Sequence, residues 1–156
     1  MVKREREIVL FAPSLNLGGG TERVLVNLSN ALISKGYKVI VACHSHGVEN
    51  IYNLDSNVVV NEYWFGKLRS QFANSFFFKI INRLLGEWLL NKFLKRITNS
   101  VDTMIISFSN NITLDCYKTT FKDNLLAFEH WPYWITNTNP KLQSQINKIY
   151  PTLNKV

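Results

Sequence analysis

The sequence predicts a single α/β domain with a Rossmann-like, doubly wound and mostly parallel sheet. Short apolar runs rich in Ile and Val alternate along the chain with longer segments whose apolar residues recur at helical spacing. The connections are short, and a strand, helix, strand unit of this kind makes a right-handed crossover and a parallel pair. With 156 residues, the chain is long enough to bury its own core.

The apolar run 8–12 is too short for a helix and is unbroken by polar positions, as expected for a strand buried on both faces. Strands are expected over residues 8–12, 37–43, 57–61, 103–108 and 125–128. Helices are expected over 24–32, 67–97, 111–121 and 139–149. Gly36 is a stop signal for the first helix, and Gly86 is a candidate for a kink or break in the second.

Composition excludes several classes of protein. Hydrophobic residues make up 46% and charged residues 19%, so the chain is neither disordered nor fibrous. The charged start argues against a signal peptide, and no stretch approaches the roughly 20 apolar residues of a spanning helix. Cys43 and Cys116 are far apart, which favours a reduced setting without a disulfide framework. We therefore expect a cytoplasmic protein.

The positive charge is concentrated in one segment. The formal net charge is +7, and residues 64–98 hold seven lysines and arginines against the single acid Glu87. The same segment is rich in aromatic residues, including Trp64 and the run 76–78. This pattern predicts a local anionic partner rather than general solubility.

A glycine turn joins the first strand to the first helix. Gly18, Gly19 and Gly20 leave the backbone N–H groups open at the positive end of the helix dipole, which suits a phosphate. Thr21 is expected to cap the helix, and Glu22 to favour its positive end. The alternative is that the glycines only permit a tight turn and close packing of the helix.

Two common phosphate-binding motifs fit this turn poorly. A dinucleotide fold requires spaced glycines and an acid at the end of the second strand, where this chain has Cys43, His44 and Ser45. A P-loop requires a lysine directly after the glycines, and Thr21 follows instead. Neither NAD binding nor P-loop chemistry is therefore expected.

The stretch 11–28 closely resembles the opening of the retaining glycosyltransferases of family 4, with their P-S-L-x-x-G-G-[AT]-E-R pattern. The segments 105–108, 129–130 and 150–156 are similar to later parts of the same amino-terminal domain. The resemblance implies one half of a GT-B fold. It also implies a second domain that binds the nucleotide sugar, and the residues typical of that domain are not in this sequence.

The resemblance implies transfer of a sugar, with retention, from a nucleotide-sugar donor to a glycan or lipid-linked acceptor in polysaccharide or cell-surface glycan biosynthesis. No metal or other cofactor is implied, and this chain alone is expected to be inactive. The donor phosphate would bind the backbone at Gly18, Gly19, Gly20 and Thr21, and His130 would contact the donor sugar as the catalytic histidine. The acceptor is expected near Asn16, Asn110, Glu129, Lys67 and Arg69.

Each of these roles has a plainer alternative. His130 would be an ordinary loop histidine without its match to the family, and Asn110 equally suits the cap of the next helix. A metal site built from Cys43, His44, His46 and Cys116 has no recognised ligand spacing. A buried thiol and two surface imidazoles are expected instead.

The basic segment has two binding interpretations. Cations flanked by aromatic residues suit an interfacial helix, so residues 64–98 are expected to contact an anionic membrane surface, peripherally at its inner face. A core-facing helix explains most of the apolar stripe equally well. No recognition motif supports nucleic acid, and none is expected as a partner. The non-enzyme alternative is a stand-alone module that binds anions or a membrane surface.

Overall fold

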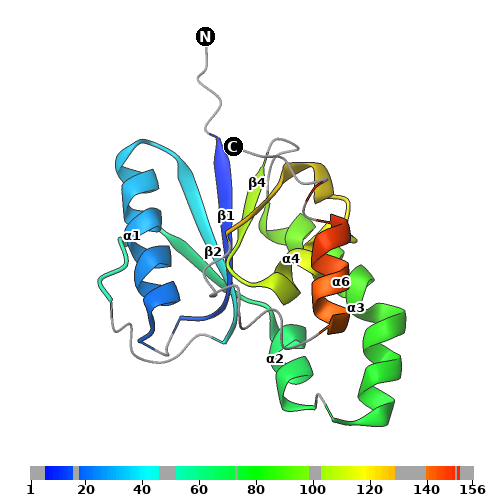
Figure 1. Cartoon of the computed structure of the whole chain (residues 1–156). Helices are drawn as coiled ribbons and strands as arrows, with labels where there is room; N and C mark the ends of the chain where they lie inside the picture. Colours follow the sequence, from blue (N-terminus) through cyan, green and yellow to red (C-terminus); the bar gives the residue numbers. More distant parts are fainter. Residues whose placement is uncertain are drawn as a thin grey trace.

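The structure, a computed structural model, describes residues 6–15, 18–45, 52–72, 74–98, 103–128, 140–149 and 151. These residues form a five-stranded sheet with the order β3-β2-β1-β4-β5, in which every neighbouring pair is parallel (Figure 1). The strands are β1 (Glu7–Ser14), β2 (Lys38–Ser45), β3 (Val59–Glu62), β4 (Met104–Ser107) and β5 (Leu125–Ala127). The predicted Rossmann-like α/β domain is confirmed.

Strand β1 is the centre of the sheet and is covered on both faces. Val9 and Phe11 belong to one hydrophobic core, whereas Ile8, Leu10 and Ala12 belong to the other. Successive side chains of a strand point to opposite faces, so a strand between two cores needs apolar residues at every position. This explains the unbroken apolar run from which the strand was predicted.

Helices cover the two faces unequally (Figure 1). Helix α1 (Gly20–Ser34) packs on one face through Leu25 and Val26, and no other helix of the described residues belongs to that core. The other core is formed under α3 (Phe76–Ile97) and α4 (Asn110–Tyr117), with α2 (Trp64–Gln71) beside them. Helix α6 (Pro140–Ile149) lies against α4. The strand order reverses between β1 and β4, which makes their carboxyl ends the switch point of the sheet.

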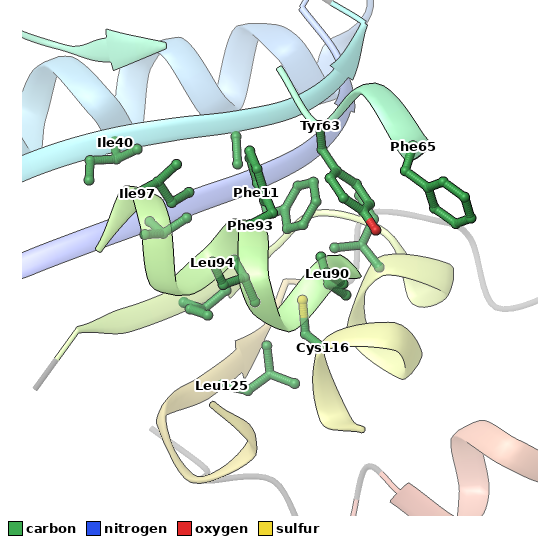
Figure 2. Packing of buried hydrophobic residues seen from close by; sticks show 14 residues of the cluster. Phe11, Ile40, Tyr63, Phe65, Leu90, Phe93, Leu94, Ile97, Cys116 and Leu125 are labelled. Carbon is green, nitrogen blue, oxygen red and sulfur yellow. The ribbon is translucent and has the colours of Figure 1, made fainter. Parts of the chain in front are cut away.

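Aromatic rings fill the core beneath α3 (Figure 2). The ring of Tyr63 lies 4.9 Å from that of Phe93 and 6.3 Å from that of Phe11, measured between centroids. Leu90, Phe93, Leu94 and Ile97 supply the buried face of α3. Only the second half of this helix therefore contributes strongly to the core.

Two predicted helix boundaries were wrong. The expected helix over 67–97 is interrupted before Ser75, whose Oγ accepts a hydrogen bond from the N–H of Phe78 at 3.4 Å and caps α3. Gly86 lies inside α3 and does not break it. The expected helix over 111–121 stops at Tyr117, and a short 3₁₀ turn, Lys122–Asn124, follows.

Candidate functional site

The glycine turn lies at the carboxyl end of β1, next to the switch point. Gly18 has a φ of 65°, a left-handed conformation that favours glycine, and Gly19 is the residue that precedes the first turn of α1. The hydroxyl of Tyr52 donates to the carbonyl oxygen of Gly18 at 2.8 Å. This hydrogen bond anchors the turn to the loop after β2. Because Tyr52 binds a carbonyl oxygen, it does not occupy the amide groups of the turn.

The side chain of Glu22 folds back over this turn. A Cβ atom at Gly19 would lie 2.8 Å from Oε2 of Glu22, and Glu22 itself is buried. An acid at the third helical position commonly turns back toward the N-cap residue, where the helix dipole stabilises its charge. The positive end of α1 thus already has a carboxylate beside it, and a bound phosphate would compete with it.

Thr21 does not cap α1, contrary to the prediction. Gly19 occupies the N-cap position and makes no side-chain cap hydrogen bond, while Thr21 lies within the first turn. Because the helix begins two residues earlier than a cap at Thr21 would require, the cap position falls on Gly19. The expectation for Glu22 is consistent with the structure, since this acid lies in the first turn of the helix.

The other predicted ligand residues are distributed over the carboxyl edge of the sheet. Asn110 is the first residue of α4, directly after β4, and it is buried. It follows the cap position, which Ser109 holds, so capping does not explain it. Since β1 and β4 are neighbours, Asn110 and the glycine turn flank the same switch point. Asn16, Glu129 and His130 lie outside the described residues.

Lys67 and Arg69 are engaged in ion pairs of α2. Lys67 Nζ lies 3.3 Å from Oε1 of Glu62, at the end of β3. Arg69 pairs with Asp115 of α4 and thereby ties α2 to α4. Helix α2 packs on the face of the sheet opposite α1, so the structure does not bring these two cations to the glycine turn. Their role in acceptor binding stays a prediction.

A cleft of about 360 Å³ opens between α2, α3 and α4, and the sequence had not indicated it. We call it the α2–α3–α4 cleft. Its polar lining comes from His44, Arg69, Asn82, Arg83, Glu87, Asp115 and Lys118. Its apolar lining comes from Phe11, Tyr63, Phe65, Leu90 and Ile112. The cleft therefore joins five elements at the carboxyl ends of β2 and β3.

His44 stands at the end of β2 against the floor of this cleft. Its ring makes an edge contact with Phe11 at 5.5 Å and a tilted contact with Tyr63 at 5.9 Å. Burial, and then the nearby Arg69 guanidinium, lower the pKa of His44 to about 4, against the opposing effect of Asp115. The imidazole is thus neutral at pH 7. The expected surface imidazole is wrong at this position.

Tyr63 lies beside His44 on the cleft floor. Burial raises the pKa of its phenol above its usual range, and the carboxylate of Asp115 acts in the same direction. The hydroxyl therefore remains protonated at all ordinary pH values. It is a neutral group that both donates and accepts hydrogen bonds next to the Arg69–Asp115 pair.

Two glycines in helices border the cleft. A Cβ atom at Gly66 of α2 would lie 2.3 Å from Cδ2 of His44, so only glycine leaves room for the imidazole. A Cβ atom at Gly86 of α3 would lie 2.7 Å from Oδ1 of Asn82. Glycine inside a helix costs roughly 1 kcal/mol relative to alanine. Gly86 was predicted only as a kink or break, and nothing was predicted for Gly66.

The two cysteines lie on opposite faces of the sheet and do not come together. Cys43 packs in the core under α1, whereas Cys116 packs in the core on the other side of the sheet. Burial raises the pKa of the Cys43 thiol to about 12 and that of Cys116 higher still. Over the described ranges, no group of three or more potential ligands could hold a metal ion. His46 lies outside those ranges.

The part of α3 from Phe76 to Trp88 exposes large apolar side chains, and we call these side chains the α3 surface. It comprises Phe76, Phe77, Ile80, Ile81, Leu84, Leu85 and Trp88, all exposed. The core-facing interpretation therefore holds for Phe93 and Ile97, which are buried, and not for these exposed residues of α3. Lys92 lies over the ring of Trp88 at 5.0 Å. None of the helices in the described ranges is long and apolar enough to cross a membrane.

Comparison with known proteins does not extend these observations. No protein-family model matches the chain, and no curated protein matches it in sequence. What bears on function is the parallel sheet, the glycine turn at its switch point, the α2–α3–α4 cleft and the α3 surface.

Proposed function

We propose that the chain is the amino-terminal, acceptor-side domain of a retaining glycosyltransferase with the GT-B fold. The observation that carries the proposal is the position of the glycine turn. The segment that resembles family 4 transferases places three glycines at the start of α1, at the carboxyl end of the central strand. Ligands of open α/β sheets bind at this edge and at the switch point.

The proposed reaction transfers a sugar from a nucleotide diphosphate to an acceptor hydroxyl. The bond from the anomeric carbon to the donor phosphate breaks, and a bond to the acceptor oxygen forms on the same face. The departing phosphate takes the acceptor proton. Amides at the start of α1 stabilise the charge that develops on that phosphate, as preorganised donors do. A second domain of the same gene product supplies most of the donor site.

Glu22 gives this proposal a specific requirement. Its carboxylate lies over Gly19, where the donor phosphate is proposed to bind. A phosphate that reaches the amides must displace the carboxylate or share the helix terminus with it. Glu22→Gln removes the competing charge while keeping the size of the side chain, and is expected to tighten phosphate binding to the turn.

The test is sugar transfer by the full natural gene product that contains this chain. We expect labelled sugar to pass from one member of a panel of nucleotide sugars to an oligosaccharide or lipid-linked acceptor, with retained anomeric configuration by NMR. His130→Ala is expected to reduce kcat, whereas Asn27→Ala on the exposed face of α1 serves as the control. Absence of transfer with every donor, or inversion at the anomeric carbon, would contradict the proposal.

A second candidate function is contact with an anionic membrane surface, and the α3 surface favours it. Phe77 is 77% exposed and Leu84 is 72% exposed. Contiguous exposed apolar side chains are unfavourable in water and mark an interaction site. Exposed cations, Lys79 and Arg83 among them, alternate with these apolar residues on the same helix. Apolar side chains can enter the membrane interface while the neighbouring cations contact anionic headgroups. This combination favours an anionic bilayer over a neutral partner.

Co-sedimentation with vesicles tests this contact. We expect binding to vesicles with anionic lipid and much weaker binding to neutral ones. Replacing Phe76 and Phe77 by serine is expected to reduce the bound fraction, while Val59→Ser, an exposed apolar position on β3, leaves it unchanged. Equal partition onto both vesicles, or dimerisation through α3 with no vesicle binding, would contradict the membrane role.

A further inference from the structure

The α2–α3–α4 cleft is a preformed space with a helix glycine on either side. Gly66 accommodates the ring of His44, and Gly86 leaves room for the side chain of Asn82. Neither glycine ends its helix. At about 360 Å³, the cleft lies at the small end of the range for small-molecule sites, and it opens at the carboxyl edge where such sites occur.

The lining of the cleft offers both hydrogen-bond donors and acceptors. The amide of Asn82 supplies both, the carboxylate of Asp115 accepts, and the protonated phenol of Tyr63 does either. The rings of Tyr63 and Phe65 add apolar surface between these groups. Such a mixture suits a ligand with several hydroxyl groups and apolar C–H faces.

The inner charges of the cleft are paired. Arg69, a cation of the α2 wall, pairs with Asp115, and His44 carries no charge at neutral pH. The other charged lining residues, Arg83, Glu87 and Lys118, are all exposed. Among the described residues, the inner part of the cleft therefore offers a phosphate no unpaired cation, whereas its amide, phenol and carboxylate groups hydrogen-bond the hydroxyls of a sugar.

We infer that the α2–α3–α4 cleft binds a terminal sugar ring of a glycan acceptor. That the bound sugar acts as an acceptor rests on the proposed function. The inference specifies that this acceptor is a glycan and not a bare lipid phosphate. Binding of a free sugar by the cleft does not depend on catalysis. It is therefore measurable on this chain by itself.

The experiment follows backbone amides of the ¹⁵N-labelled protein by NMR during titration. The probes are glucose, galactose, mannose, rhamnose, N-acetylglucosamine and inorganic phosphate. At least one sugar is expected to shift the amides of Gly66, Gly86 and Asp115 saturably, with no matching shifts from phosphate. Shifts at the cleft from phosphate alone, or from none of the probes, would overturn the inference.

Matched variants assign the binding to the cleft. Asn82→Ala is expected to weaken sugar binding by about tenfold, the loss of one or two hydrogen bonds, and Asn27→Ala on α1 is the control. Gly86→Leu fills the cleft and is expected to abolish binding while circular dichroism shows an intact fold. Unchanged affinity in both cleft variants would contradict the assignment.

Kinetics of the full gene product separate this inference from the proposed function. Asn82→Ala is expected to raise KM for the acceptor and to leave KM for the donor unchanged. Sugar binding in the cleft without any transfer would defeat the proposed function alone. Transfer with an unaltered acceptor KM in Asn82→Ala would defeat the cleft inference alone.

Discussion

The glycine turn and the α2–α3–α4 cleft both lie at the carboxyl edge of one sheet, yet they are built in opposite ways. The turn is local, since Gly18, Gly19 and Glu22 all lie within five residues of each other. The cleft is assembled from residues as far apart as Phe11 and Lys118. In the turn, Gly18 adopts a left-handed conformation and Gly19 leaves room for the flexible carboxylate of Glu22. In the cleft, Gly66 leaves room for the packed ring of His44.

This difference predicts which of the two sites tolerates substitutions better. A carboxylate such as that of Glu22 rotates away from an added methyl group at small cost. The ring of His44 is held between Phe11 and Tyr63 and has no such freedom. The cleft is thus the more rigid of the two sites, and substitutions there are expected to cost the most free energy.

The largest effect is expected for Gly66→Ala. The new methyl group would lie 2.3 Å from the His44 ring, which cannot shift without disturbing the aromatic core, so the free energy of unfolding should fall by about 3 kcal/mol. Urea denaturation followed by circular dichroism measures this change.

Gly86→Ala is the matched control, because its methyl group would approach closely only the end of the Asn82 side chain and would make an ordinary contact with the Phe65 ring at 3.8 Å. That variant is expected to be neutral or stabilised by up to about 1 kcal/mol through helix propensity. Equal destabilisation of both variants would show that the cleft is not rigid around His44.

Acid should destabilise the cleft through His44. The folded-state pKa of about 4 lies below the unfolded value of 6.5, so the unfolded state binds more protons between these values. Stability is therefore full above pH 6.5 and declines as the pH falls toward 4, by on the order of 2 kcal/mol. Urea unfolding at pH 7 and pH 4.5 measures the loss.

His44→Phe removes the titrating group and is expected to flatten this part of the pH profile. The same slope in wild type and in His44→Phe would mean that another group causes the acid sensitivity. An NMR titration of the His44 ring with a midpoint near 6.5 would contradict its burial.

The smallest effect is expected at the glycine turn. Gly19 has an extended backbone that alanine also adopts, so Gly19→Ala should cost only about 1 kcal/mol, mainly through the displaced Glu22 carboxylate and a poorer cap. In a Glu22→Ala background the same change should cost less, and a double-mutant cycle measures the coupling. If the free-energy effects of the two substitutions simply add, the Glu22 carboxylate does not interact with the residue at position 19.

The sequence predicted what depends on local pattern. The apolar run of β1 showed a strand buried on both faces, and the glycines before Thr21 located the turn correctly. Whether Glu22 covers that turn depends on side-chain rotation, which has no signature in the spacing of residues.

The cleft and the ion pairs could not be predicted, because they depend on contacts between distant elements. Arg69 pairs with Asp115, 46 residues later in the sequence, and no local pattern indicates this partner. The apolar repeat of α3 predicted a helix. It did not indicate which half of that helix packs against the core. Gly66 and Gly86 were visible in the sequence, but only the structure shows which neighbours require them.

One measurement tests most directly whether the two regions are separate ligand sites. Amide shifts of the labelled chain are recorded with a nucleoside diphosphate and, separately, with the sugar that binds most strongly. We expect the diphosphate to shift the amides of Gly18 to Thr21, more strongly in Glu22→Gln, and the sugar to shift those of the α2–α3–α4 cleft. Shifts from both ligands in one region, or a diphosphate that leaves the glycine turn unchanged in Glu22→Gln, would contradict this account.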